Sequence, residues 1–413
     1  MKIPFSPPYI DQDVIDSVSE SLSSGWITTG PKVKALEELV QEQTGAKRTL
    51  CVNSATSGLM LSLKWFGVGS GDEVIIPAYT YAATALAVIH VGATPVMVDV
   101  EDDFNVSISA IENAVTEKTK AIVPVDFSGW PCDYGALQNL VTKVSIRDKF
   151  CPNSDKQKAL GRILLLADAA HSIGATYKGR NSGTLADLTV FSFHAVKNIT
   201  TAEGGAVCIA LPEPFDCGSE YALMRLMTLN GQTKDAFTKT KAGGWKYDIV
   251  LPGMKINMPD VCASIGLAQL RKYPSLLLPE RKRVAEFYVD NFRQYDWALI
   301  PPLRGQESES SYHVFALRIE GITEVQRDEM IRLISEKGVA VNVHFTPLPM
   351  LSLFKEMGFK ISGYPQAYAN YSKEISLPIY PQLTEDELAY IVGSVAEAYS
   401  CVVLEKEESE AGI

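Results

Sequence analysis

The chain has 413 residues, of which 46% are hydrophobic and 21% charged, and its formal net charge at pH 7 is −11. This length predicts two domains, or one large domain with a smaller appendage. The composition is typical of a globular protein rather than a disordered or fibrous one. The acidic balance and the lack of any lysine or arginine block argue against binding to nucleic acid or to a membrane surface.

Seven cysteines are scattered along the chain without a Cys-x-x-Cys spacing, several of them in apolar runs such as GGAVCIAL. This usage is typical of reduced thiols in a cytoplasmic protein. The first ten residues lack the apolar core of a signal peptide, and no apolar run of about 18 residues follows, so we expect neither export nor a membrane span. No ligand spacing predicts a metal site.

Two helices are predicted first, over residues 11–25 and 30–45, the second with Pro31 near its start and Gly45 at its end. From residue 45 to 210, short β-branched runs alternate with amphipathic segments, which is typical of a wound α/β sheet. The expected strands cover residues 49–54, 72–79, 94–100, 120–126, 162–168, 188–193 and 204–210. The helices expected between them cover residues 57–67, 80–92, 107–115 and 133–141.

The rest of the chain predicts a second, smaller domain of α+β type. Its expected helices cover residues 258–273, 279–295, 325–338 and 385–400, and its expected strands cover residues 312–320 and 339–345. We therefore predict a large domain over 1–250, a small domain over 251–400 and a charged, disordered tail over 401–413. The segment 143–161 has little pattern and is expected to be a surface excursion.

Small hydroxyl residues follow the first predicted strand, in the run VNSATSGLM. We expect the next helix to begin near Ser57, with the amides of Ala55, Thr56 and Ser57 pointing outward. Free amides at a helix N-terminus bind phosphate. The alternative is an ordinary N-cap made by Ser54 or Thr56.

Polar side chains also follow two later strands. Asp168 comes directly after an apolar strand in LLLADAAHSIGA, and Ser192 and Lys197 lie in FSFHAVKNITTAEGG. Asp168 could cap the next segment and Lys197 could be a solvated loop lysine, but a buried carboxylate is costly without a cation or donor. Pyridoxal phosphate would use a phosphate site, a carboxylate for its ring nitrogen and a lysine for its aldehyde.

These motifs, with PAYTYAAT, GATPVMVDV, TKAIVPV and INMPDVCASIGLAQL in the same order, resemble the DegT/StrS family of sugar-nucleotide aminotransferases. The resemblance runs from about residue 3 to residue 395. It implies aspartate-aminotransferase fold type I, an α/β fold with a large, mostly parallel seven-stranded sheet and a smaller C-terminal α+β domain.

The resemblance also implies roles for individual residues. Lys197 is expected to form the Schiff base with pyridoxal 5′-phosphate and to move the proton later in the cycle. Asp168 is expected to pair with the pyridinium nitrogen, and Tyr81 to stack on the cofactor ring, although Tyr81 could instead be a core aromatic. The expected phosphate ligands are Ala55, Thr56 and Ser192.

Other positions match the family less directly. His171 lies where many members have glutamine near the cofactor's ring oxygen, and its alternative is a satisfied buried histidine. Lys255 and Asn257 replace parts of a Gly-x-Asn-x-Arg pattern that reaches across a dimer interface to the phosphate. The resemblance therefore implies a homodimer with shared active sites. His344 matches a histidine near the sugar pocket, and its alternative is a structural histidine at a strand end.

The implied reaction moves an amino group from glutamate to a keto-sugar nucleotide, for surface polysaccharide or lipopolysaccharide biosynthesis. A UDP-linked 4-keto-6-deoxyhexose is favoured, and a UDP-4-ketopentose or a 3-keto sugar remains open. Sugar choice is expected to depend on residues 25–31, 240–250 and 344–350. A pyridoxal-phosphate sugar dehydratase and a non-catalytic regulator are the rival classes, and the presence of Lys197 argues against both.

Overall fold

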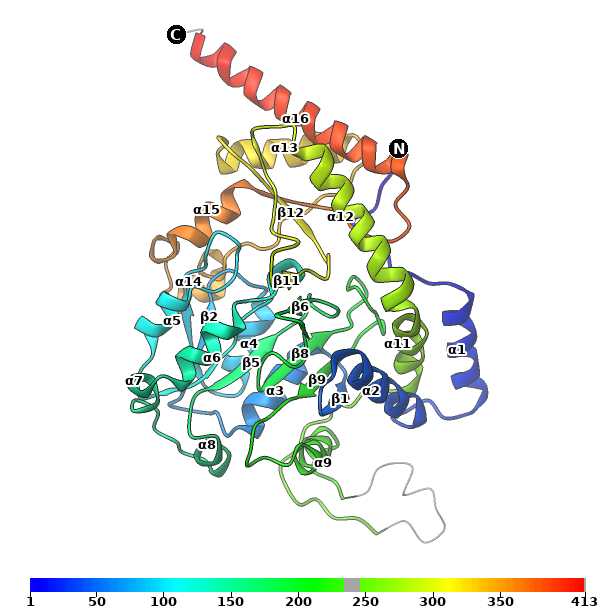
Figure 1. Ribbon diagram of the computed structural model, residues 1–413, viewed down its shortest axis with the longest axis vertical. Helices are drawn as coiled ribbons and strands as arrows, with labels where there is room; N and C mark the ends of the chain where they lie inside the picture. The colour runs from blue at the N-terminus through cyan, green and yellow to red at the C-terminus, as the bar shows by residue number, and fades with distance from the viewer. Residues whose placement is uncertain (234–245, 412–413) are drawn as a thin grey trace.

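A central seven-stranded sheet organises the structure (Figure 1). The computed structural model describes residues 1–233 and 246–411, with side chains through residue 403. The strand order is β1-β9-β8-β5-β4-β2-β3, and β9 runs opposite to the other six strands. The strands are β1 (Arg48–Val52), β2 (Glu73–Pro77), β3 (Thr94–Val98), β4 (Thr119–Ile122), β5 (Leu164–Asp168), β8 (Leu188–Ser192) and β9 (Gly205–Ile209). The predicted mostly parallel seven-stranded sheet is confirmed.

Alternate residues of the strands pack into different cores, because side chains along a strand point to opposite faces. In β1, Leu50 and Val52 belong to one core and Cys51 to another. Burial on both faces explains why these strands are continuous apolar runs. The helices that contribute buried residues to the first core include α3 (Ala55–Trp65), α4 (Ala82–His90), α5 (Ile108–Ala114), α6 (Tyr134–Thr142), α9 (Cys217–Thr228) and α15 (Pro365–Lys373).

The other core lies between the sheet and a layer of helices. That layer contains α1 (Gln12–Ser23), α2 (Pro31–Thr44) and α11 (Asp260–Lys272), which pack together although α11 is far away in sequence (Figure 1). The Asp260 carboxylate accepts the backbone N–H groups of Gly30, Lys32 and Val33 and so caps α2 from α11. This contact ties α2, near the start of the chain, to the much later helix α11.

A third core lies beside the sheet β10-β12-β13. Its elements are β10 (Ala298–Leu299), β12 (Phe315–Ile319), β13 (Glu374–Leu377), α12 (Leu278–Phe292), α13 (Glu324–Glu336) and α16 (Glu385–Ala411). Ile3 joins this core and pairs with Val339. The domain limits 1–250 and 251–400 stay a prediction, because α11 packs with the first unit and Ile3 with the second.

Three segments differ from the sequence expectations. Residues 339–345 form isolated bridges and no strand, because their alternating valines face other elements without a continuous partner strand. Helix α3 begins at Ala55 because the Ser54 side chain caps it. Helix α16 continues to Ala411, into the tail for which we expected disorder, through a run with four glutamates, a residue that favours helix.

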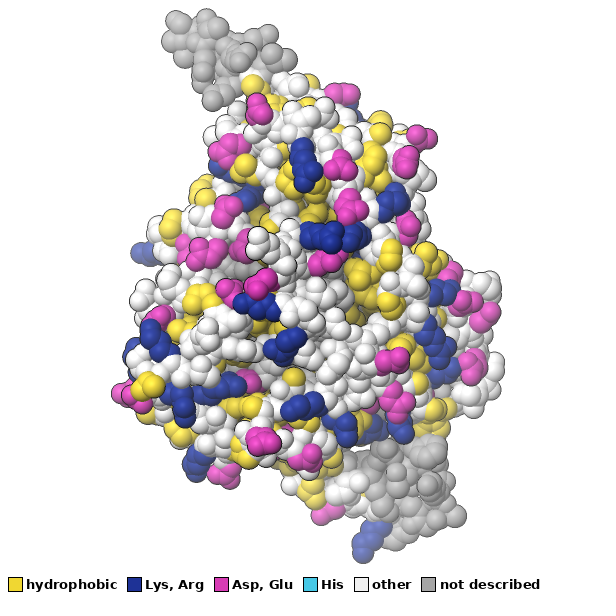
Figure 2. All heavy atoms as spheres, viewed as in Figure 1, with side chains coloured by type: hydrophobic (Ala, Val, Ile, Leu, Met, Phe, Trp, Pro, Cys, Tyr) yellow, Lys and Arg dark blue, Asp and Glu magenta, His cyan; other side chains and the backbone are white. Residues whose placement is uncertain are grey.

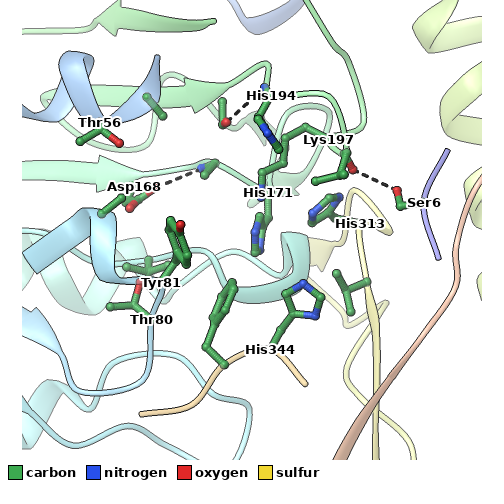
Figure 3. Close-up of a pocket in the computed structure, with 18 of the residues that line it drawn as sticks. Ser6, Thr56, Thr80, Tyr81, Asp168, His171, His194, Lys197, His313 and His344 are labelled. Atoms are coloured by element: carbon green, nitrogen blue, oxygen red, sulfur yellow. Dashed lines mark hydrogen bonds between the residues drawn. The ribbon is translucent and has the colours of Figure 1, made fainter. Parts of the chain in front are cut away.

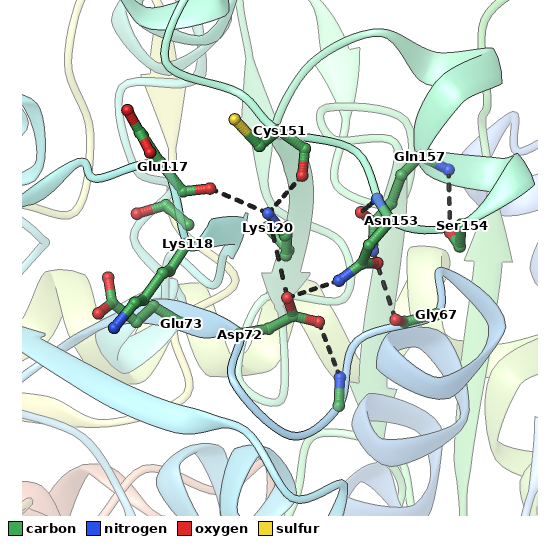
Figure 4. Close-up of polar contacts among 12 residues, drawn as sticks. Gly67, Asp72, Glu73, Glu117, Lys118, Lys120, Cys151, Asn153, Ser154 and Gln157 are labelled. Atoms are coloured by element: carbon green, nitrogen blue, oxygen red, sulfur yellow. Dashed lines mark hydrogen bonds and ion pairs between the residues drawn. The ribbon is translucent and has the colours of Figure 1, made fainter.

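The segment 143–161 contains the short helices α7 (Val144–Arg147) and α8 (Asp155–Leu160) and is held by a buried lysine (Figure 4). Lys120 Nζ donates to the carbonyl of Cys151 at 2.5 Å and to that of Glu117 at 3.0 Å. It lies 4.0 Å from Asp72, whose carboxylate also accepts from Asn153 Nδ2 at 2.8 Å. The excursion is therefore anchored to the sheet domain through polar contacts that its sequence did not suggest.

Basic and acidic side chains are interspersed over the face seen in Figure 2. Within the described residues, no helix is long and apolar enough to cross a membrane.

Candidate active site

A cavity of about 440 Å³ opens at the carboxyl ends of the sheet strands (Figure 3). Ligands in open α/β sheets bind at this edge. The predicted residues that line it are Ala55, Thr56, Tyr81, Asp168, His171, Ser192, Lys197 and His344. In Figure 3, Thr56 and Asp168 lie toward one end of the cavity and His313 and His344 toward the other.

The N-terminus of α3 forms one end of the cavity. Ser54 Oγ accepts the Ser57 backbone N–H at 3.1 Å, so Ser54 is the N-cap and the Ser57 amide is engaged. The amides of Ala55 and Thr56 are the first two of the helix and have no intrahelical acceptor. The expectation of three free amides is therefore corrected to two, and the cap and the anion-binding geometry coexist.

Gly205 allows the sheet to approach this helix end closely. It lies opposite Val52 of β1 and opposite Ser192 of β8. A Cβ at Gly205 would lie 2.8 Å from the Ala55 nitrogen and 2.7 Å from the Phe191 carbonyl oxygen. A side chain at this position would displace the amides of the helix end, so only glycine fits.

Asp168 ends β5 and is buried below the cavity. Burial raises the pKa of its carboxyl, while hydrogen bonds from Thr84 and Ala170 and the charge of Lys197 act in the opposite direction. Thr84 Oγ1 donates to Oδ2 at 2.7 Å, and the Ala170 N–H lies 3.3 Å from Oδ1. Among the described residues, no cation forms an ion pair with Asp168. A positively charged group of a ligand would therefore stabilise this buried carboxylate.

Lys197 lies in the loop that follows β8. Its backbone N–H donates to the His194 carbonyl at 2.9 Å, and this tight turn directs the side chain into the cavity (Figure 3). Burial lowers the pKa of the Lys197 amine to about 8, with Asp168 raising it in part. With this pKa, about a tenth of the amine is unprotonated at pH 7, far more than for an ordinary lysine, and the unprotonated form can act as a nucleophile or a proton acceptor.

Four of the five histidines of the chain line the cavity. Burial keeps three of them neutral: it lowers the pKa of His344 to about 3 and the pKa values of His171 and His313 well below their usual range. His171 Nδ1 accepts the Ser128 N–H at 3.2 Å, so its ring proton is on Nε2. His313 Nδ1 lies 2.8 Å from the Asn198 side-chain oxygen. An amide oxygen only accepts, so Nδ1 of His313 carries the ring proton and donates it.

Tyr81 precedes α4 and leaves its ring open to the cavity. Its side chain is 64% exposed, and its ring lies 5.8 Å from that of Phe345 at an angle of 47°. It is therefore not a core aromatic, and its face is available for stacking on a flat ligand.

The structure describes Lys255 and Asn257, and neither lines the cavity of its own chain. They lie beside the end of β1, where Asn257 pairs with Val52, and Lys255 Nζ donates to Asn257 Oδ1. Asn257 Nδ2 in turn donates to Thr29 Oγ1 at 2.5 Å. Their expected role across a dimer interface stays a prediction.

The cavity residues fit pyridoxal phosphate. Within the part of the chain that the structure describes, the buried Asp168 carboxylate forms no ion pair, two amides at a helix end are free, and the Lys197 amine has a lowered pKa. These three groups match the ring nitrogen, the phosphate and the aldehyde of the cofactor. Among the described residues, no group of three or more histidine, cysteine, aspartate or glutamate side chains could hold a metal ion.

Sequence reasoning missed Thr84, Gly205 and His313. Thr84 lies one helical turn after Tyr81, a spacing that could have indicated a shared face. His313 comes from a segment far from the recognised motifs, and only the fold brings its ring to 4.3 Å from that of His171. Among the loops expected to set sugar choice, the loop at residues 344–350 contributes His344 and Phe345 to the cavity wall. Residues 240–245 of another of these loops lie outside the described residues.

Comparison with known proteins agrees with this geometry. SpsC of Bacillus subtilis, a spore coat polysaccharide biosynthesis protein, is 34% identical over 96% of this chain and 96% of its own. The sugar aminotransferase Spr1654 of Streptococcus pneumoniae, in its PMP form, is 43% identical, with a TM-score of 0.94 over 98% of this chain and 100% of its own. Helicobacter pylori PseC, an aminotransferase of pseudoaminic acid biosynthesis, is 28% identical, with a TM-score of 0.85 over 97% and 100%.

The sequence pattern of one family matches residues 8–148 and 154–396. The match leaves out residues 149–153, which belong to the excursion anchored by Lys120. The chain therefore belongs to the DegT/DnrJ/EryC1/StrS aminotransferase family, a family of pyridoxal-phosphate-dependent enzymes of fold type I, as its motifs predicted.

Proposed function

We propose that this enzyme transfers an amino group from glutamate to a keto-sugar nucleotide. The observation that carries the proposal is the joint placement of the Lys197 amine and the buried Asp168 carboxylate in one cavity that also contains a free helix N-terminus. The names of Spr1654, SpsC and PseC support a sugar as the acceptor.

The cavity residues would hold the cofactor at three points. The amides of Ala55 and Thr56 and the Ser192 hydroxyl would bind the phosphate, since Ser192 Oγ accepts the His194 N–H and keeps its own proton to donate. Asp168 would face the ring nitrogen and Tyr81 would stack on the ring. When bound, pyridoxal phosphate supplies an aldehyde for the amine and a ring that withdraws electrons from the reacting carbon.

Lys197 performs the proton transfers in this proposal. With a pKa of about 8, its amine can accept a proton from a substrate carbon and return it at neutral pH. His171 presents its Nε2–H to the cavity as a neutral donor for an oxygen of the cofactor or substrate. The low pKa of the ring prevents it from competing with Lys197 for the proton.

The acceptor that we favour is a UDP-linked 4-keto-6-deoxyhexose, and a UDP-4-ketopentose or a 3-keto sugar is the alternative. Neutral imidazoles bind hydroxyl and carbonyl groups without demanding charge, which suits a sugar ring. The product would be an amino-sugar nucleotide for surface polysaccharide or lipopolysaccharide, made in the cytoplasm. A homodimer would bring Lys255 of each chain toward the phosphate of the other.

An absorbance spectrum of the purified holoenzyme tests the proposal. We expect a visible band that glutamate bleaches into the near ultraviolet, and a keto-sugar nucleotide should restore the band while it is aminated. Lys197→Ala should abolish both changes, and Lys178→Ala, at a lysine paired with Glu307 outside the cavity, should retain them. A protein that stays colourless after incubation with pyridoxal phosphate would refute the proposal, and loss of a hydroxyl without amination would instead indicate a dehydratase.

A further inference from the structure

Two side chains of β13 form a hydrogen-bonded chain with the cavity residue His344. Glu374 and Ser376 are two residues apart and therefore point to the same face of the strand. Ser376 Oγ contacts Glu374 Oε1 and lies 2.8 Å from His344 Nδ1. The His344 backbone N–H donates to Glu374 Oε2 at 3.0 Å, so both carboxyl oxygens are engaged.

No ion pair reaches Glu374 among the described residues, although two arginines lie near it. Arg327 on α13 donates to the backbone carbonyl of Glu374 at 3.0 Å and to Asp328, and Arg318 on β12 pairs with Asp102. The Tyr79 phenol, after β2, donates to the His344 carbonyl at 2.7 Å. Burial therefore raises the pKa of Glu374 to about 8, against the lowering effects of its hydrogen bonds and of the two arginines.

The direction of the hydrogen bonds depends on whether Glu374 carries a proton. An ionised carboxylate only accepts, so Ser376 donates to Glu374 and accepts from Nδ1–H of His344, which leaves Nε2 with a free lone pair. A protonated Glu374 donates to Ser376, Ser376 donates to Nδ1, and the ring proton is on Nε2. Between the two states, one proton enters at Nε2, the Nδ1 proton moves to Ser376, and the Ser376 proton moves to Glu374.

We propose that Glu374 and Ser376 are positioning residues that set which ring nitrogen of His344 carries the proton. Through them, a buried carboxyl determines whether His344 offers the cavity a hydrogen-bond donor or an acceptor. The His344 ring lines the cavity, and no bond of Nε2 to another described residue competes with a ligand.

The consequence for substrate recognition rests on the proposed function. Protonated Glu374 gives an Nε2–H that suits the carbonyl oxygen of a keto sugar, whereas ionised Glu374 gives an acceptor that suits a hydroxyl. Near pH 8 the enzyme would therefore change its preference for the group placed against His344.

Histidine ¹⁵N NMR of the deuterated, uniformly ¹⁵N-labelled holoenzyme tests the relay, because the two tautomers have distinct nitrogen shifts. His344→Gln identifies the signal, and the exposed His90 serves as internal reference. From about pH 6 to about pH 10, the His344 proton should move from Nε2 to Nδ1 without formation of an imidazolium.

Two variants serve as matched controls. Glu374→Gln keeps the shape. Its amide oxygen would accept the His344 backbone N–H, so its N–H₂ group would face Ser376 and donate to it, and His344 should keep the Nε2–H tautomer at every pH. Ser376→Ala should remove the pH dependence by breaking the chain. A wild-type tautomer that does not change with pH, or that changes equally in Glu374→Gln, would overturn the proposal.

Kinetics separate this inference from the proposed function. In the wild type, kcat/KM for the keto-sugar nucleotide should change about tenfold across pH 8, and in Glu374→Gln this change should be absent. The pH profile of kcat/KM for glutamate should be the same in both proteins. If the wild type aminates no keto sugar, the proposed function fails, and the NMR result still decides the relay.

Discussion

Thr84 donates a hydrogen bond of 2.7 Å from its Oγ1 to Oδ2 of Asp168. The two residues are far apart in sequence and meet because α4 and the end of β5 flank the same cavity. Thr80 Oγ1 lies 3.0 Å from Thr84 Oγ1 and supports its orientation. Since the bond favours the ionised carboxylate, it offsets part of the effect of burial on the pKa of Asp168.

Replacing Thr84 with valine keeps the shape of the side chain and removes the donor. We expect the pKa of Asp168 to rise and kcat/KM for glutamate to fall about tenfold, the equivalent of one hydrogen bond to a charged group. Thr84→Ser, which keeps the hydroxyl, should lose less than the valine variant. Equal losses in the two variants, measured by stopped-flow absorbance, would mean that packing rather than the hydrogen bond matters.

Gly205→Ala should damage the phosphate end of the cavity. The added Cβ would lie 2.8 Å from the Ala55 nitrogen, so the backbone must shift. We expect the free energy of unfolding to fall by about 1–3 kcal/mol and the cofactor to bind more weakly, as followed by thermal melts and by titration with pyridoxal phosphate. Gly393→Ala is the control, because its Cβ meets nothing within 4 Å and lies in helix α16. Unchanged cofactor affinity in Gly205→Ala would contradict the proposed phosphate site.

Shared active sites predict complementation between inactive chains. If Lys255 acts on the partner's cofactor, Lys197→Ala and Lys255→Glu chains should each be inactive alone, and their mixture should recover part of the activity after re-association. One of the two sites in a mixed dimer would then hold both lysines. Subunit exchange, checked by native mass spectrometry, with no recovery of activity would argue for sites completed within one chain.

A buried carboxyl that does not line the cavity, Glu37, predicts how stability depends on pH. Burial raises the pKa of Glu37 from 4.5 to about 7, although Cys51 and Tyr221 donate hydrogen bonds to it. Between these values the folded chain binds more protons than the unfolded chain, so the contribution of Glu37 to stability falls as pH rises. Glu37→Gln removes this titration. We expect its unfolding free energy, relative to wild type, to increase from about pH 4.5 to about pH 7 and then level off, as measured by urea unfolding. A constant difference would refute the raised pKa.

The sheet was predictable because its strands are short apolar runs closed by glycine and proline, and because helices alternate with them. The positions of Asp168 and Lys197 were predictable for a related reason, since parallel strands deliver their following loops to one edge. The segment 339–345 was wrongly predicted as a strand. Its valines alternate as in a strand, but pairing depends on a neighbour that the local sequence does not specify.

The contacts around the predicted residues required the folded chain. His313 and Glu374 carry no local pattern that links them to the cavity, and the spacing of Thr84 from Tyr81 does not reveal that its partner is Asp168. Each of the three meets its partner through the packing of separate elements. The excursion at 143–161 was predicted to be on the surface, but its attachment depends on Lys120, a residue that the sequence places inside a strand. Long-range polar contacts of this kind leave no periodic signal.

The first residues of the chain form part of the cavity wall, and this affects how the protein can be modified. Ile3 pairs with Val339, the Phe5 ring lies 5.5 Å from that of His344, and Ser6 Oγ donates to the Val196 carbonyl at 3.0 Å. An affinity tag or fluorescent fusion joined directly before Met1 would therefore be tethered a few residues from the cavity wall. The far end of α16, which projects away from the sheet domain in Figure 1, is the better attachment point for immobilising the active enzyme.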